Sequence, residues 1–223
     1  MQIKTAAEQI AEILRDYIFS GTLSPGAKLR EVEVSKMLNV SRTPIREAFR
    51  ILESDGLVEV SSNRGVQIPL IPPRDTEEVC EFRQLVESYC IRKFITLLDE
   101  NHLQEMEGIV RHTEEALDQS DYTSYYAHSI AFHSYYISKC QNDRLYAAFT
   151  RIRNSMRCSQ MILDKDLGFL RASVNKHKEI IEALRERDSD KSERIMMDHL
   201  VTNCQMMKRN LEGNTRLQAE IEI

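Results

Sequence analysis

The sequence lacks any long apolar run. Nowhere among its 223 residues do about 18 consecutive apolar residues occur, the length that spans a bilayer as a helix. Residues 1–13 also lack the apolar core of a secretory signal peptide, because Glu8 and Glu12 interrupt them. We therefore expect a protein without a membrane span that stays in the cytoplasm.

Cysteine is scarce and scattered. The chain has five cysteines, an odd number, and no Cys-x-x-Cys pair. Disulfide frameworks and cysteine zinc sites use recurrent, closely spaced cysteines, so this pattern argues against both. We expect reduced and mostly buried thiols at Cys80, Cys90, Cys140, Cys158 and Cys204.

An excess of positive charge is also missing. The net charge is −5, and residues 1–70 hold nine basic and nine acidic side chains. Sequence-independent binding to DNA draws mainly on positive charge, so the composition argues against an architectural DNA-binding protein. Any specific contact with nucleic acid must come from local clusters of basic residues.

Glycine and proline are sparse, and their positions divide the chain. Four of the seven glycines lie within residues 1–70, and Pro72 and Pro73 follow a short apolar run. Two consecutive prolines interrupt both helices and central strands. We place a domain boundary here, between residues 1–71 and residues 75–213.

Apolar periodicity predicts the elements of both domains. In the first, Thr43 is the expected N-cap of a helix whose first turn contains Pro44. The elements expected there are helices over 5–19, 31–38 and 44–55 and strands over 57–60 and 65–68. In the second domain no strand-like alternation occurs, and a six-helix bundle is expected, with helices over 76–98, 101–118, 122–139, 143–164, 169–187 and 189–212.

The third predicted helix carries an arginine row beside its apolar stripe. Arg42, Arg46 and Arg50 recur every four residues and so share one face. Guanidinium groups pair bidentately with phosphates and guanine edges. The alternative is a solvated face that pairs with nearby acidic residues. The position of the row, behind a short helix and a tight turn, favours contact with DNA.

Three further residues extend this candidate surface. Ser41 and Thr43 stand at the helix start, where hydroxyl and free N–H groups can meet a phosphate. Plain helix capping explains both equally well. Arg64 precedes Gly65 in the predicted hairpin loop, where it can reach a neighbouring groove or remain an ordinary solvated arginine.

These segments together resemble the GntR family of winged-helix repressors. The resemblance is carried by Leu-Ser-Pro-Gly-Ala-Lys-Leu-Arg-Glu at 23–31, Val-Ser-Arg-Thr-Pro-Ile-Arg-Glu-Ala at 40–48, Leu-Glu-x-x-Gly-Leu-Val at 52–58 and Asn-Arg-Gly-Val at 63–66. It implies a mainly α fold, with an N-terminal winged helix-turn-helix before the all-α bundle. It also implies operator contacts by Arg30, Ser41, Arg42, Thr43, Arg46 and Gly65, with the Arg64–Gly65 wing tip entering the minor groove.

All six histidines lie in the second domain, and three of them stand out. His133, His177 and His199 fall on three different predicted helices. Three neutral imidazoles can bind a divalent transition metal and leave coordination positions open. The spacing alone favours the plainer interpretation, histidines that hydrogen-bond locally, because no His-x-x-x-His pair is present.

Residues 75–212 resemble the FCD sensor domain of the FadR-like branch of GntR proteins. The resemblance is carried by Glu-Phe-Arg-x-x-Val-Glu at 81–87, Phe132-His133, Asn142, His177 and His199. It implies a zinc or nickel ion held by the three histidines and by an acidic residue four positions before His133. That position is Ser129, a poor zinc ligand without charge. Arg83 then pairs with the carboxylate of a small organic acid, or forms an ordinary salt bridge with Glu87.

The sequence therefore predicts a ligand-responsive transcription regulator. We expect a homodimeric repressor that reads an inverted-repeat operator and whose effector changes its affinity for DNA. The alternative is a metal-dependent enzyme with a DNA-binding appendage. No nucleophile elbow, His-Glu-x-x-His motif or phosphate loop in the sequence supports that alternative.

Overall fold

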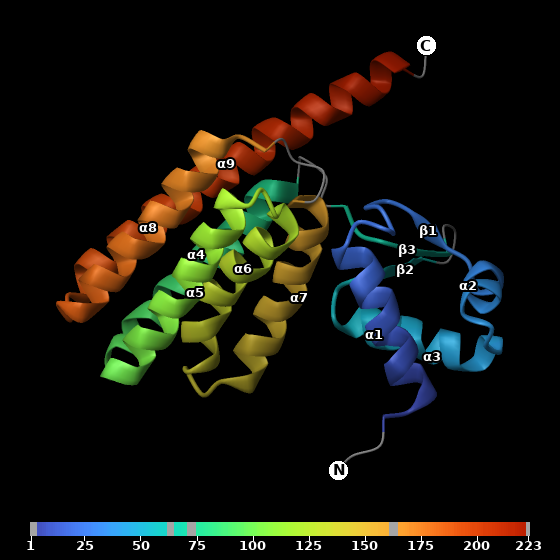
Figure 1. Ribbon diagram of the computed structural model, residues 1–223, viewed down its shortest axis with the longest axis horizontal. Helices are drawn as coiled ribbons and strands as arrows, with labels where there is room; N and C mark the ends of the chain where they lie inside the picture. Colours follow the sequence, from blue (N-terminus) through green and yellow to red (C-terminus); the bar gives the residue numbers. More distant parts are fainter. Residues whose placement is uncertain (1–3, 62–64, 71–74, 161–164, 222–223) are drawn as a thin grey trace. The chain divides into compact units, whose positions relative to one another are not determined.

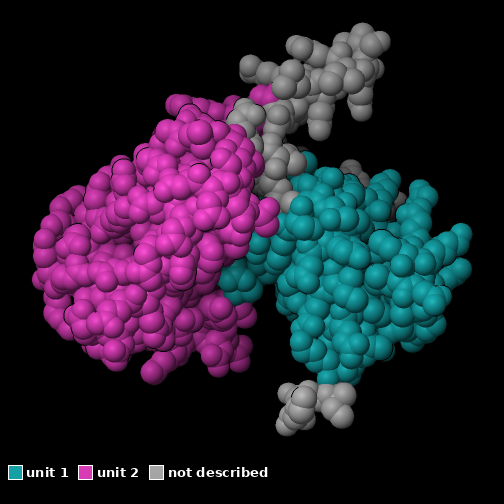
Figure 2. All heavy atoms as spheres, viewed as in Figure 1, with its two compact units in different colours: residues 1–71, 150–162 teal, residues 72–149, 163–223 magenta. Residues whose placement is uncertain are grey.

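The chain forms two compact units, each with its own apolar core. A computed structural model describes residues 4–61, 65–70, 75–160 and 165–221 (Figure 1). The first unit comprises residues 1–71 and 150–162, and the second comprises residues 72–149 and 163–223 (Figure 2). Apolar side chains are buried in two separate clusters, one for each unit.

The first unit combines helices with a small antiparallel sheet. Its elements are α1 (Ala6–Phe19), β1 (Lys28–Leu29), α2 (Glu31–Leu38), α3 (Arg42–Ser54), β2 (Glu59–Ser61) and β3 (Gly65–Gln67). The strand order is β1-β3-β2, so β3 pairs on both edges. The predicted order of three helices and a hairpin is confirmed. Strand β1 was not predicted because two residues are too few to show an alternating pattern.

Helix α3, after the turn that follows α2, begins two residues earlier than predicted. Asn39 ends α2 in the left-handed conformation, with φ 52°. The N-cap of α3 is Ser41, not Thr43, so the helix already begins at Arg42. The prediction was wrong because Pro44 is tolerated throughout a first turn, where backbone N–H groups have no helical acceptor.

The first hairpin strand begins two residues later than predicted. Leu57 and Val58 are buried, and the Leu57 N–H donates to the Leu52 carbonyl oxygen at 2.8 Å. These residues therefore close the end of α3, and the sheet pairing starts at Glu59.

The end of helix α7 (Asp143–Gln160) belongs to the core of the first unit. Cys158 is buried there together with apolar side chains of α1 and α3, among them Phe49. Asn154 Nδ2 donates to the backbone oxygen of Asp55, the C-cap of α3, at 2.8 Å. Helix α3 is thus held at its C-terminal end by a residue that lies about 100 positions later in the chain.

The second unit is helical throughout its described residues. Besides the start of α7 it contains α4 (Thr76–Ile95), α5 (Glu100–Asp118), α6 (Tyr122–Ser138), α8 (Leu167–Arg185) and α9 (Ser189–Ile221). Helix α4 packs along α9, α5 along α6 and α8, and α8 along α9 (Figure 1). The helical bundle is as predicted, although α9 continues past Gly213, which does not adopt the left-handed conformation that ends many helices. Among the helices described, none is both long and apolar enough to cross a membrane.

A disulfide bond joins Cys80 of α4 to Cys204 of α9. The expectation of reduced thiols is therefore wrong for this pair, whereas Cys90, Cys140 and Cys158 are free and buried. The pair lies 124 residues apart in the sequence, and the packing of α4 on α9 brings it together. Spacing along the chain carries no sign of such a contact.

Candidate metal centre and nucleic-acid interface

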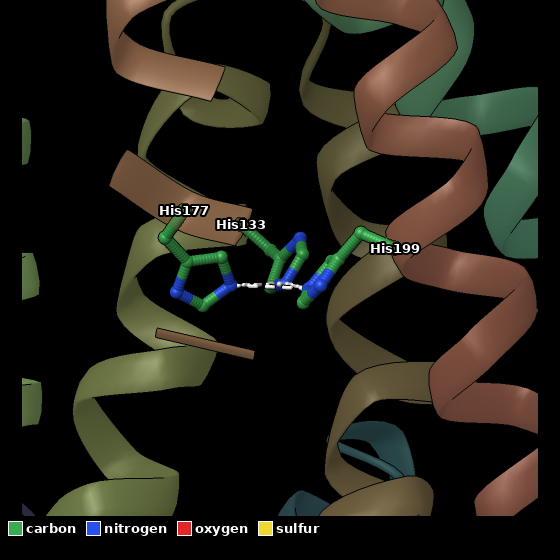
Figure 3. A group of neighbouring side chains, drawn as sticks. All are labelled: His133, His177 and His199. Carbon is green, nitrogen blue, oxygen red and sulfur yellow. Dashed lines mark hydrogen bonds between the residues drawn. The ribbon is translucent and has the colours of Figure 1, made fainter. Parts of the chain in front are cut away.

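Three buried histidines from three helices meet in the second unit. His133 lies on α6, His177 on α8 and His199 on α9, and none is more than 6% exposed. Their Nε2 atoms are 3.1 Å apart between His177 and His199 and 3.3 Å apart in the other two pairs. Figure 3 shows the three rings directed toward one another. The structure thus brings together the three histidines singled out in the sequence.

This set of nitrogens fits a divalent metal ion. In a tetrahedral zinc site with Zn–N bonds of about 2.0–2.1 Å, ligand nitrogens stand about 3.3 Å apart. Burial, reinforced by neighbouring charges, lowers the pKa of His177 and His199 well below the usual histidine value. Both rings are therefore neutral, which is the form that binds metals.

Glu87 on α4 orients the ring of His133. Its buried Oε2 accepts hydrogen bonds from His133 Nδ1, at 2.6 Å, and from the Tyr136 hydroxyl. Burial opposes ionisation of Glu87, but the charges of Arg83 and His133 and these hydrogen bonds outweigh it and lower its pKa. Because the ionised carboxylate can only accept, Nδ1 keeps a proton, so that in the neutral form of the ring Nε2 presents its lone pair to the other histidines.

Arg83 lies one turn before Glu87 on the same helix. Its Nε donates to Glu87 Oε1 at 2.6 Å, so the salt bridge considered for it in the sequence is present. The Arg83 side chain is only 9% exposed, and its two terminal nitrogens make no hydrogen bond with any described residue. Glu87 links Arg83 to the histidine group, because its Oε1 accepts from Arg83 and its Oε2 from His133. The charge of Arg83 also contributes to the low pKa of His177 and His199.

Two further residues, for which the sequence predicted no role in the site, contact the other two rings. Phe132 stacks on His177 with ring centroids 4.1 Å apart. Asn203 Nδ2 donates to the His199 carbonyl oxygen at 2.9 Å and lies 3.1 Å from His199 Nε2. The signal for Asn203 is its position four residues after His199, on the same helix face.

Ser129, at the position of the expected acidic ligand, is half-buried on α6 and supplies no carboxylate. Among the described His, Cys, Asp and Glu side chains, the group that converges as metal ligands consists of the three histidines. Glu87, the carboxylate beside them, is engaged by Arg83, His133 and Tyr136. A metal ion held by three neutral nitrogens keeps its full charge and open positions, which favours an anionic ligand.

In the first unit, α3 buries one face and exposes the predicted arginine row. Arg42, Arg46 and Arg50 are exposed. Arg46 Nε donates to Glu31 Oε1, at the start of α2, at 2.7 Å. The buried face consists of Ile45, Ala48, Phe49 and Leu52. The alternative of a row paired with acidic neighbours therefore applies to Arg46 alone, because Arg42 and Arg50 form no ion pair with a described residue.

The start of α3 is open for an anion. Ser41 is the exposed N-cap residue, yet its side chain makes no capping hydrogen bond. Simple capping therefore does not account for Ser41, and the first-turn N–H groups beside it remain available. Thr43 is exposed in this first turn.

The remaining predicted contacts lie at the start of α2 and in the hairpin. Arg30 is the exposed N-cap of α2 and forms an ion pair with Glu33 at 3.2 Å. Gly65 begins β3 with φ 76°, a conformation that favours glycine. Arg64 lies outside the described residues.

Two family models match the chain. Residues 6–68 match the family described as bacterial regulatory proteins, gntR family, and residues 78–202, more than half of the chain, match the FCD domain. The chain belongs to the GntR family of bacterial regulatory proteins. This GntR regulator is a DNA-binding transcription regulator with an FCD ligand-binding domain, and the enzyme alternative finds no support among its relatives.

Individual relatives cover nearly the whole chain. The Uxu operon regulator of Haemophilus influenzae is 30% identical over 86% of this chain and 78% of that protein. The HTH-type transcriptional repressor RspR of Escherichia coli K12 is 28% identical over 93% and 91%, respectively. A GntR transcriptional regulator of Rhodococcus sp. RHA1, known as a crystal structure, is 27% identical with a TM-score of 0.80, over 92% of this chain and 98% of that one.

Proposed function

We propose that this GntR regulator is a homodimeric cytoplasmic repressor whose operator affinity responds to a small carboxylate bound at a metal ion. The observation that carries the proposal is the convergence of three imidazole nitrogens beside a buried arginine whose terminal nitrogens make no hydrogen bond with a described residue. A repressor is favoured because the relative RspR is named as one.

The DNA-reading surface is proposed at the α2–α3 turn and the wing. Arg46, already oriented by Glu31, reads bases or phosphates together with Arg42, which forms no ion pair with a described residue. Exchanging the exposed Glu31 partner for DNA costs little, because exposed ion pairs contribute about 1 kcal/mol or less. The full proposed contact set is Arg30, Ser41, Arg42, Thr43, Arg46, Arg64 and Gly65. A two-fold dimer presents this set twice, which suits an inverted-repeat operator.

The effector site is proposed at the histidine group. A zinc or nickel ion bound by His133, His177 and His199 would supply a positive centre for one carboxylate oxygen. Arg83 donates its terminal N–H groups to the carboxylate, and Glu87 holds the Arg83 guanidinium in place. The burial of these residues strengthens the pairing, because charges attract more strongly away from water.

Effector binding alters DNA affinity only if the effector prefers one conformation of the dimer. The test uses full-length, metal-loaded protein and an operator selected by it from random duplexes. Fluorescence anisotropy then measures operator affinity with a panel of hydroxycarboxylates and dicarboxylates, and with their uncharged amides. At least one carboxylate should shift the affinity about fivefold or more, and its amide should not.

Arg83→Gln serves as the matched variant. It should bind the operator as the wild type does without effector, yet respond to no carboxylate, since glutamine lacks the cationic donors. A response that persists in Arg83→Gln would remove Arg83 from the effector site. Equal responses to amides and acids would reject the carboxylate class.

A further inference from the structure

The Cys80–Cys204 disulfide connects the two helices that frame the histidine group. Cys80 lies on α4, three residues before Arg83, and Cys204 lies on α9, five residues after His199. The bridge therefore ties the helix of Arg83 and Glu87 to the helix of His199. It takes no part in the metal and effector binding proposed above.

Polar contacts already hold α4 and α9 together elsewhere. Glu193 of α9 accepts hydrogen bonds from Ser88 and Arg92 of α4. Near the start of α4, an exposed ion pair of Lys208 with Glu77 lies along the same two helices as the bridge. Exposed ion pairs contribute little, so the covalent bond is the stronger of these two connections.

The redox state of the cellular compartment bears on the role of this disulfide. A bacterial DNA-binding regulator works in a reducing compartment, a step that rests on the proposed function. Disulfides there are usually transient and redox-sensing rather than permanent. The pairing is also selective, because the other three cysteines, all described, remain free and buried.

We propose that Cys80 and Cys204 form a redox-modified thiol pair, oxidised by a small-molecule disulfide, and that their bridge fixes α4 against α9 at the metal site. One cysteine thiolate attacks the small disulfide, which forms a mixed disulfide and releases one thiol. The second cysteine attacks the protein sulfur of that mixed disulfide, closes the bridge and releases the second thiol. The two cysteine protons end on the two released thiols, so the exchange is balanced.

The bridged form holds Arg83, Glu87 and His199 in one arrangement. Opening the bridge releases the start of α4 from α9 and loosens that arrangement. A preorganised site binds its ligand more tightly than one that must first be ordered. The oxidised protein therefore binds a divalent metal more tightly than the reduced protein.

The test compares oxidised and reduced wild-type full-length protein with the Cys80→Ser/Cys204→Ser double variant. Alkylation and peptide mass mapping follow the thiols through reduced and oxidised glutathione mixtures. Hydrogen exchange of α4 and α9 is measured on metal-free protein, and zinc affinity by competition with a chromophoric chelator. Cys90→Ala, which removes a free thiol from the same helix, is the matched control.

We expect the bridge to open and close reversibly in the folded protein. The reduced protein and the double variant should exchange amides faster at the start of α4, and should bind zinc about tenfold more weakly than the oxidised wild type. Cys90→Ala should behave as wild type. If neither state binds zinc, the proposed metal site fails, and hydrogen exchange alone decides on the thiol pair. A bridge that opens only on unfolding, one that never re-forms, or identical exchange and affinity in both states overturns the proposal.

Discussion

The Oε2 atom of Glu87 lies 2.6 Å from Nδ1 of His133 in the core of the second unit. This contact decides which ring nitrogen of neutral His133 is free, because the carboxylate accepts a hydrogen bond from Nδ1–H and so leaves Nε2 without a proton. Carboxylates that support metal-binding histidines in this way raise the affinity of the metal. The relationship extends the site from three histidines on α6, α8 and α9 to a fourth helix, α4.

Replacing Glu87 with glutamine should weaken metal binding while His133 remains in place. Loss of a side chain that hydrogen-bonds to a metal-binding histidine typically reduces metal affinity about 10- to 100-fold. Competition titration of zinc against a chromophoric chelator measures the change. Glu81→Gln, at an exposed position of the same helix, should leave the affinity unaltered. Equal affinities in Glu87→Gln and wild type would contradict the orienting role.

Asn203→Ala should also lower zinc affinity, by about tenfold, because the amide is held against His199. Asn210→Ala supplies a close control. Asn210 lies two turns further along α9, and its amide likewise donates to the backbone oxygen four residues earlier, that of Met206. A decrease of equal size in both variants would show that Asn203 acts through helix stability and not through His199.

Arg46→Ala should abolish recognition of the operator. A side chain that reads a base contributes about 1–3 kcal/mol of discrimination, so specific affinity should fall by roughly fivefold to more than a hundredfold. Binding to unrelated duplex at the same salt concentration should change far less. Arg144→Ala removes the same charge from an exposed position of the second unit and should leave operator binding intact. Wild-type operator affinity in Arg46→Ala would exclude this residue from base reading.

Gly56→Ala should destabilise the first unit through two effects. Gly56 has φ 73°, and a Cβ there would lie 2.5 Å from the Arg151 backbone oxygen. The left-handed conformation alone costs an L residue about 1–2 kcal/mol, and the steric clash adds to it. Gly26→Ala separates the two effects, because Gly26 has φ 79° and open space around its Cβ. Chemical denaturation should give a lower free energy of unfolding for Gly56→Ala than for Gly26→Ala. The reverse order would show that α7 moves away from the added Cβ without loss of stability.

Local sequence patterns were sufficient for most of the fold. Apolar periodicity located the helices, and the two strands of the hairpin followed from short runs near Gly65. The contacts of α7 with the first unit and the Cys80–Cys204 bond were not predictable, because each joins residues about 100 or more positions apart. The domain limits at 1–71 and 75–213 remain a prediction.

Only part of the candidate site could be predicted, because local spacing does not show which helices pack together. The resemblance identified His133, His177 and His199, and an i,i+4 spacing suggested the Arg83–Glu87 pair. That Glu87 also accepts from His133 depends on the packing of α4 against α6, which spacing does not encode. The contacts with DNA and effector stay predictions, since they involve partners outside the chain.

We propose that three histidines hold a metal ion although Ser129 occupies the usual acidic position. Elemental mass spectrometry of untagged protein, purified without chelator, measures the bound metal. We expect about one zinc or nickel ion per chain, the content of a single site of this type, and loss of that ion in His177→Ala. Metal-free protein, even after incubation with zinc, nickel or manganese, would show that the three histidines do not form a metal site.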